Sequence, residues 1–278
     1  MKLYKTKKGI VIQKNDSYFL ANVQNWDSFI NDDHLYSKMQ TITETNAPSA
    51  EAKIFIDSGI QPPIQSQEIW ACGVTYYRSK VGRQEESKNT GGSEFYARVY
   101  EAERPEIFFK ATASRTVGHG DKVRIRKDST WDVPEPELTL AVTSSGKIVG
   151  YTVGNDMSSR SIEGENPLYL PQAKTYDGSA AIGPCIYVTE ELLPPETFIQ
   201  MQIFRQSQVA FEGEVAISQI KRTLQELVSY LFRETSFPNG CLVMTGTGIV
   251  PSNDFTLKQD DEIHITIQHI GTLVNTVY

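Results

Sequence analysis

The sequence predicts an α+β protein in which strands dominate, with a small N-terminal domain at residues 1–65 and a larger domain at residues 66–278. Short segments in which apolar and polar residues alternate recur along the chain, which is typical of strands with one buried face. Helical spacing is clearest over one segment, near Ala216–Arg233. The pair Pro62-Pro63 marks the predicted domain boundary. These observations favour an antiparallel or mixed sheet with few helices.

The N-terminal domain is predicted to contain two short strands and a helical patch. The strands are expected at Gly9–Gln13 and Tyr18–Val23, and the helical patch at Trp26–Met39. The stretch that follows, Thr41–Ala52, is polar and contains a proline, so we expect a linker there.

The larger domain opens with a predicted strand, Glu68–Val74, and a polar stretch from Tyr76 to Glu103. This stretch has no apolar period and contains a glycine pair. Long irregular segments in compact domains are usually functional loops or are disordered, and we expect a mobile lid over residues 77–103. Two further strands are predicted at Glu106–Lys110 and Asp121–Arg126.

Three acidic residues, Glu135, Glu137 and Asp156, lie on a segment that is predicted to form one β-hairpin. Apolar residues follow Glu137 and precede Asp156, and a Ser-Ser-Gly-Lys sequence separates the two runs. A two-residue turn at Ser145-Gly146 would place Glu135 directly opposite Asp156. A turn at Gly146-Lys147 would place Glu137 opposite Asp156 instead. In both registers the three side chains share one face, because side chains alternate along a strand.

Three carboxylates in this arrangement are close enough to share a cation. Directly opposed Cβ atoms are roughly 5 Å apart and diagonal ones roughly 7–8 Å, so unpaired carboxylates there repel each other. Oxygen ligands suit the hard cations Mg²⁺, Mn²⁺ and Ca²⁺, and the sequence has no His-x-His or HExxH spacing that would favour zinc. The alternative is a solvated acidic strand edge, which Pro136 would suit. That alternative explains less well why no lysine or arginine lies among the three acids.

The rest of the chain is predicted to form a coil, a helix, a turn and two strands. Residues 157–184 are polar with little periodicity, and a coil leaving the hairpin suits substrate contacts. The helix at Ala216–Arg233 precedes a strand at Cys241–Met244. Thr245-Gly246-Thr247-Gly248 is either an ordinary turn or one whose hydroxyls and backbone N–H groups hold a carboxylate. Glu262–Gln268 alternates as a final strand.

Composition excludes several classes of function. The formal net charge is −7 and the basic residues are scattered, which argues against nucleic-acid binding. No apolar run approaches the roughly 20 residues of a membrane span, and the N-terminus lacks the apolar core of a signal peptide. The 3 cysteines are far apart without CxxC spacing. They indicate reduced, buried thiols and a cytoplasmic protein.

Two further side chains are candidates for proton transfer near a cation. Lysine is usually a surface residue, but a nearby cation lowers the pKa of a lysine such as Lys174 and favours a neutral amine base. Glu106 begins a strand and precedes aromatic residues, so it is either a surface acid or a partly desolvated general acid/base. His119, in Gly-His-Gly-Asp, is interpreted as a turn residue.

Four motifs together resemble the fumarylacetoacetate hydrolase superfamily, in the order and spacing of that family. They are Glu135-Pro-Glu137, Gly154-Asn-Asp-Met-Ser-Ser-Arg160, Lys174-Thr-Tyr-Asp-Gly178 with Ile182-Gly-Pro184, and Thr245-Gly-Thr247. The resemblance implies a mixed β-sandwich or roll as the catalytic domain and a homodimer or higher homo-oligomer. It also implies a set of site residues: Glu135, Glu137 and Asp156 as Mg²⁺ ligands, Lys174 beside the metal, and Tyr76, Arg160 and Thr247 as substrate contacts.

Two departures refine this resemblance. Hydrolytic members carry a catalytic histidine a few residues after the tyrosine that corresponds to Tyr76, and the segment here, residues 76–82, has none. The runs Arg104–Lys110 and Glu163–Lys174 are most similar to the branch that contains 2-keto-3-deoxy-arabinonate dehydratase. In that branch Glu106 and Lys174 would be the acid/base pair. Ser161 stands where relatives usually have aspartate.

The resemblance therefore implies a divalent-metal-dependent dehydratase of 2-keto-3-deoxy sugar acids. It would convert a 2-keto-3-deoxypentonate to 2-oxoglutarate semialdehyde through a metal-stabilised enolate, with a small-molecule 2-keto acid as its substrate. The alternatives on the same fold are an acylpyruvate hydrolase, an oxaloacetate decarboxylase and a 2-hydroxydienoate isomerase. A protein that binds keto acids without turnover is a further alternative.

Overall fold

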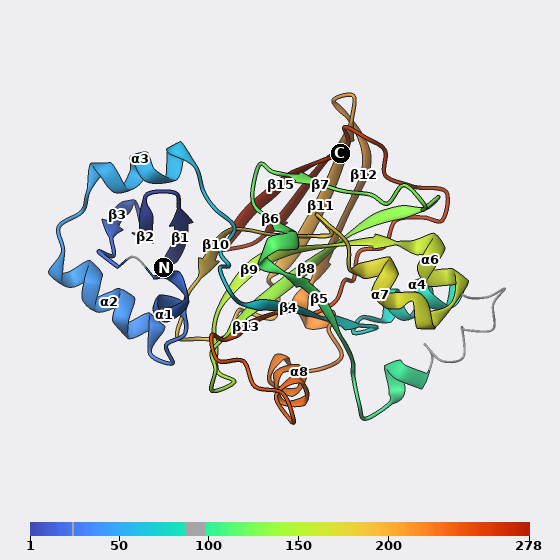
Figure 1. Cartoon of the computed structure of the whole chain (residues 1–278), viewed down its shortest axis with the longest axis horizontal. Coiled ribbons are helices and arrows are strands. Elements are labelled where there is room, and N and C mark those ends of the chain that lie inside the picture. Colours follow the sequence, from blue (N-terminus) through green and yellow to red (C-terminus); the bar gives the residue numbers. More distant parts are fainter. Residues whose placement is uncertain (24, 87–97) are drawn as a thin grey trace.

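Two β-sheets that pack on each other form the centre of the molecule (Figure 1). The computed structural model describes residues 1–23, 25–86 and 98–278. The larger sheet has ten strands, and nine of them follow the order β3-β2-β1-β10-β9-β8-β13-β4-β5 while β6 pairs with β10. The smaller sheet has five strands in the order β12-β11-β14-β15-β7. The prediction of a mostly β, α+β fold is confirmed.

The strands of the larger sheet are, in that order, β3 (Ser17–Leu20), β2 (Gly9–Lys14), β1 (Lys2–Thr6), β10 (Ala180–Tyr187), β9 (Ile148–Ser159), β8 (Asp132–Val142), β13 (Cys241–Met244), β4 (Glu68–Gly73) and β5 (Glu106–Thr112), with β6 at Thr116–Val117. Those of the smaller sheet are β12 (Gln208–Ala216), β11 (Phe198–Arg205), β14 (Glu262–Ile267), β15 (Gly271–Val277) and β7 (Lys122–Val123). Inward-facing side chains of both sheets form one apolar core. Since β8 lies in the middle of the larger sheet, it is buried along its whole length.

The helices lie around the two sheets. They are α1 (Trp26–Ile30), α2 (Leu35–Thr45), α3 (Ala50–Ser58), α4 (Tyr77–Glu86), α6 (Arg160–Glu165), α7 (Leu170–Lys174) and α8 (Leu224–Leu231), with short 3₁₀ turns at Ala113–Arg115, Pro167–Tyr169 and Ile217–Gln219. The first three lie beside β1–β3 at one end, and α4, α6 and α7 lie together at the other end (Figure 1). Within the described ranges no helix has the length and apolar character needed to cross a membrane.

The N-terminal segment differs from its prediction at the expected linker. Helix α2 continues to Thr45 and α3 begins at Ala50, so helices occupy both ends of the stretch Thr41–Ala52 that was expected to be a linker. The reason is a cap that the polar composition concealed, because the Ser49 hydroxyl accepts the N–H of Ala52 and Ala52 packs in the core. Strand β1 pairs with β10, so this segment extends the larger sheet. The domain division near residue 65 stays a prediction.

Four other predictions were wrong in part. The lid over residues 77–103 was expected to be irregular, but its first part is α4, and residues 87–97 lie outside the described ranges. The coil at 157–184 contains α6 and α7. The long C-terminal helix begins at Leu224 instead of Ala216, because the Thr223 hydroxyl caps it by accepting the N–H of Glu226. The predicted strand at 121–126 shrinks to β7.

The acidic hairpin is formed by β8 and β9, and its register matches one of the two predicted alternatives. Glu135 pairs with Asp156, and Glu137 pairs with Gly154. The turn is longer than the two residues expected, since the N–H of Thr143 donates to the carbonyl of Lys147 at 2.9 Å. An irregularity in the pairing beyond Ala141 compensates for the longer turn and restores the register.

Candidate active site

Glu135, Glu137 and Asp156 form a buried carboxylate cluster at the middle of the β8–β9 hairpin. One oxygen from each lies within 4.8 Å of the others, and the side chains are 5%, 1% and 1% exposed. The strand register explains the cluster, because Glu135 and Asp156 are paired and Glu137 is the next residue on the same face. Burial excludes the alternative of a solvated acidic strand edge.

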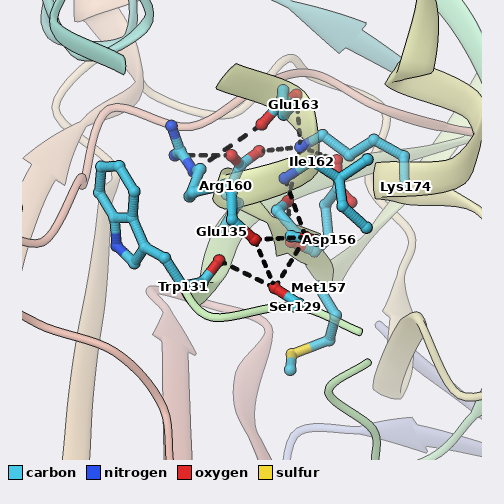
Figure 2. A network of polar contacts seen from close by, with 12 residues as sticks. Ser129, Trp131, Glu135, Asp156, Met157, Arg160, Ile162, Glu163 and Lys174 are labelled. Carbon is cyan, nitrogen blue, oxygen red and sulfur yellow. Dashed lines mark hydrogen bonds and ion pairs between the residues drawn. The ribbon is translucent and has the colours of Figure 1, made fainter. Parts of the chain in front are cut away.

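Three cations surround the carboxylate cluster. The ammonium of Lys174 donates to Oε2 of Glu135 at 2.8 Å, Oδ2 of Asp156 at 3.0 Å and the Ser158 hydroxyl at 2.6 Å. Arg160 places Nη2 2.7 Å from Oε1 of Glu135. Lys174 and Arg160 therefore approach Glu135 from opposite sides (Figure 2). The third cation is Lys110, whose Nζ lies 2.5 Å from Oδ1 of Asp156.

Lys110 and Glu163 were not predicted as site residues. Lys110 is 0% exposed and Glu163 is 1% exposed. Glu163 lies 3.9 Å from both Arg160 and Lys174 (Figure 2). A lysine inside the apolar run of β5 was one available signal, and the three-residue spacing from Arg160 to Glu163 on one helix was another.

The charges of this buried group leave room for a divalent cation. Four carboxylates, Glu135, Glu137, Asp156 and Glu163, face three cations, Lys110, Arg160 and Lys174, so the fully ionised group carries one net negative charge. Burial, followed by the charges of Asp156 and Glu135, raises the pKa of Glu137 well above its usual value. A site made of buried oxygens that resists full ionisation fits a hard divalent cation.

A cavity opens beside the carboxylate cluster at the carboxyl ends of two parallel strands, β4 and β13. Its lining includes Cys72, Gly73, Val74, Ser79, Phe108, Glu135, Asp156, Arg160, Lys174, Gly246 and Thr247. Gly246 has φ +90° and leaves no room for a Cβ, which would lie 2.1 Å from the Thr75 hydroxyl. Its N–H donates to Oε2 of Glu137 at 2.6 Å, so this turn fixes Glu137.

Glu106 lies against Gly73, a residue of the cavity wall, and itself lines a neighbouring pocket. It begins β5 opposite Gly73, where an added Cβ would lie 2.1 Å from Oε2 of Glu106. Because Gly73 has no side chain, the Glu106 carboxylate can pack directly on the backbone of the cavity wall. The charge of Glu106 also reaches Cys72, a lining residue whose pKa is raised by burial, then by Glu137 and Glu106.

The three predicted substrate contacts lie in different places. Arg160 and Thr247 line the cavity. The Thr247 hydroxyl donates to the carbonyl of Ile249 and accepts the N–H of Ile249, both at 3.2 Å. Tyr76 is 1% exposed and belongs to the apolar core, where it packs on Gly248. The structure therefore brings two of the three to the cavity wall, and their roles stay predictions.

Ser161 and His119 have structural contacts. The Ser161 hydroxyl lies 2.9 Å from that of Ser129 and accepts the N–H of Thr130 at 3.2 Å, so it holds the start of α6 to the preceding loop. The Nδ1 of His119 accepts the N–H of Val274 at 3.2 Å, in keeping with the interpretation as a turn residue.

The raised pKa of Glu137 predicts how the stability of the metal-free protein depends on pH. The folded protein holds this proton more tightly than the unfolded chain, so stability falls as pH rises above about 4.5. Asp132 acts in the same direction, since burial raises its pKa to about 6. For Asp156, Lys110 and Lys174 outweigh the effect of burial and lower the pKa, which affects stability only below its usual 3.8.

We expect the melting temperature of the metal-free protein to fall between about pH 5 and pH 8, and Mg²⁺ to oppose this fall because it stabilises the ionised carboxylates. Thermal melts at several pH values, with Mg²⁺ and with a chelator, measure this. A melting temperature that rises with pH in the chelator would contradict the assignment.

The chain is similar to several known proteins. The family model described as fumarylacetoacetate (FAA) hydrolase C-terminal matches residues 75–278. A probable 2-keto-3-deoxyxylonate dehydratase of Haloferax volcanii is 50% identical over 80% of this chain and 76% of its own length. The 2-dehydro-3-deoxy-D-arabinonate dehydratase of Saccharolobus solfataricus is 44% identical over 80% of this chain and 75% of its own.

A solved structure extends the similarity over the whole chain. It is a 2-keto-3-deoxy-D-arabinonate dehydratase complexed with magnesium and 2,5-dioxopentanoate. The TM-score is 0.84 and the identity 36%, and the match covers 100% of this chain and 98% of the other.

Proposed function

The chain belongs to the fumarylacetoacetate hydrolase family, and we propose that it is a divalent-metal-dependent dehydratase of 2-keto-3-deoxy sugar acids. A 2-keto-3-deoxypentonate would lose water and yield 2-oxoglutarate semialdehyde, which is 2,5-dioxopentanoate. The observation that carries this proposal is the ammonium of Lys174, held by two of the three clustered carboxylates at the wall of the cavity. The two dehydratases with 44% and 50% identity support the same reaction.

Glu135, Glu137 and Asp156 would hold Mg²⁺, with Mn²⁺ or Ca²⁺ as alternatives. When bound, the cation supplies Lewis-acid polarisation of the 2-keto group and stabilises the enolate charge. Bringing a dipositive ion and a monoanionic keto acid to a group with one net negative charge gives a neutral assembly. This balance supports a small 2-keto acid as the substrate.

Lys174 and Glu106 would move the protons. One removes a proton from C3 of the substrate, and the other protonates the hydroxyl that leaves C4. Loss of water creates a C3–C4 double bond. A proton shift from C5 to C3 then gives a C4–C5 enol, and transfer of the enol proton to C4 gives the aldehyde. Lys174 lines the cavity from α7, and Glu106 lies on β5 against Gly73 of the cavity wall, so the two groups come from separate elements. General acid–base groups of this kind typically contribute 10²–10⁴-fold in rate.

Arg160 and Thr247 would bind the substrate from the cavity wall. Arg160 already pairs with Glu135, so its guanidinium also fixes one of the proposed metal ligands. Tyr76 would act from behind the wall, by supporting the turn that contains Gly248. We also propose that the protein is cytoplasmic and forms a homodimer or higher homo-oligomer. The three buried cysteines, none of them in a disulfide, support the cytoplasmic location.

The test is product analysis by NMR. Purified protein with Mg²⁺ is given a panel of 2-keto-3-deoxypentonates, an acylpyruvate, oxaloacetate and a 2-hydroxydienoate. We expect 2,5-dioxopentanoate from at least one pentonate, and no formation of it in chelator. Turnover of an acylpyruvate or oxaloacetate, with every pentonate left unchanged, would contradict the proposal.

A further inference from the structure

Lys110 occupies an irregular position in β5. Ile69 of β4 pairs with Ala111, but the next residue, Trp70, pairs with Phe109. Lys110 is therefore the extra residue of a β-bulge, a feature that re-aims a side chain and is frequent beside active sites. The side chain is 0% exposed, which is rare for lysine and requires complete pairing of its charge.

The ammonium of Lys110 contacts three oxygens, one through an ion pair and two through hydrogen bonds. Nζ lies 2.5 Å from Oδ1 of Asp156, donates to the carbonyl of Met157 at 3.0 Å and donates to the carbonyl of Lys174. One charge thus connects three elements: β5, the hairpin strand β9 and the last residue of α7. Lys110 is absent from the cavity lining formed by the described residues, so it acts through these partners.

The contacts divide the two oxygens of Asp156 between two lysines. Oδ1 faces Lys110, whereas Oδ2 faces Lys174, which lines the cavity. The carbonyl that Lys110 holds belongs to Lys174 itself, and β5 begins with Glu106. A shift of Lys110 would therefore move a metal ligand and both candidate proton-transfer groups relative to each other.

We propose that Lys110 is a positioning residue that keeps Oδ1 of Asp156 away from the cation and sets the spacing between the metal ligand and the Lys174–Glu106 pair. This inference rests on the proposed function. It has a consequence that separates it from a purely structural role. Removing a buried positive charge next to Asp156 strengthens the attraction of the site for Mg²⁺ while it disturbs the geometry of proton transfer.

The test compares Lys110→Met with wild type in two measurements. Calorimetric titration of metal-free protein with Mg²⁺ should give an affinity equal to or tighter than wild type. Turnover of the pentonate should fall by at least about 10-fold, the lower end of the effect of losing a residue that supports a metal ligand. Lys5→Met is the matched control, because Lys5 is partly buried, donates to the carbonyl of Ile64 and is remote from the cavity. It should change neither quantity.

Two results would overturn the inference: a parallel loss of Mg²⁺ affinity and turnover, which means general loosening, or unchanged turnover. If Lys110→Met does not fold, Lys110→Gln keeps a donor without the charge and is judged by the same outcomes. Exchange of the pyruvate methyl protons in D₂O, measured by NMR in each variant, reports enolate formation without dehydration. Wild type that exchanges pyruvate but dehydrates no pentonate would contradict the dehydratase and leave the Lys110 comparison valid.

Discussion

Replacement of Lys174 by methionine is expected to reduce turnover by about 10³-fold, within the range for loss of a general acid or base. Methionine retains much of the side-chain volume but removes the ammonium that donates to Glu135, Asp156 and Ser158. The loss should fall on kcat, because Lys174 is one of the two groups that the proposal assigns to proton transfer. Mg²⁺ affinity should be retained, since the variant lacks a positive charge beside the carboxylates.

The measurements are kcat and KM of the pentonate reaction and a Mg²⁺ titration of the metal-free variant. Lys258→Met is the control, because Lys258 is an exposed lysine remote from the cavity, and it should match wild type. Activity of Lys174→Met within a few fold of wild type would remove Lys174 from the chemistry. It would leave the proposal without one of its two proton-transfer groups.

Glu137→Gln is expected to have opposite effects on stability and function. Burial, Asp156 and Glu135 all raise the pKa of Glu137, so the ionised form is costly in the metal-free protein. A neutral amide removes that cost, and the melting temperature in chelator near neutral pH should rise by a few degrees, since 1 kcal/mol corresponds to about 2–4 °C in domains of 150–250 residues. The amide oxygen can still accept the N–H of Gly246.

The same substitution should weaken Mg²⁺ binding by at least about 100-fold, the upper end of the effect for residues that only support a ligand. Turnover and the Mg²⁺-dependent rise in melting temperature should both disappear. The exposed strand residue Glu214 provides the control, and Glu214→Gln should behave as wild type. If the variant is less stable than wild type in chelator and binds Mg²⁺ with normal affinity, Glu137 is a structural residue and not a ligand.

The sequence predicted the carboxylate cluster because its determinants are local. Alternation along two adjacent strands fixes the shared face of Glu135, Glu137 and Asp156, whatever the turn. The choice between the two registers was not predictable, because a longer turn and a compensating pairing irregularity act together. Neither leaves a distinct pattern in the sequence, since both depend on how the turn packs against Asp33.

The cations around the cluster were only partly predictable. The family resemblance assigned Arg160 to the substrate and placed Lys174, already a candidate base, beside the metal, whereas Lys110 and Glu163 belong to residue types that are rarely buried. Burial of Lys110 depends on its pairing with β9 and α7, which are far from β5 in the chain. Burial of Glu163 depends on its pairing with Arg160 and Lys174. The expected linker at Thr41–Ala52 failed for a related reason, because packing of Ala52 in the core outweighs its polar neighbours.

The most direct test of the account is a crystal structure of the protein with Mg²⁺ and oxalate, which mimics the carboxylate and 2-oxygen of an enolised keto acid. We predict one Mg²⁺ bound by Glu135, Glu137 and Asp156, with oxalate chelating it in the cavity and Lys174 and Glu106 facing the oxalate. Mg²⁺ bound elsewhere, or oxalate bound to Arg160 without a metal at these carboxylates, would contradict the account.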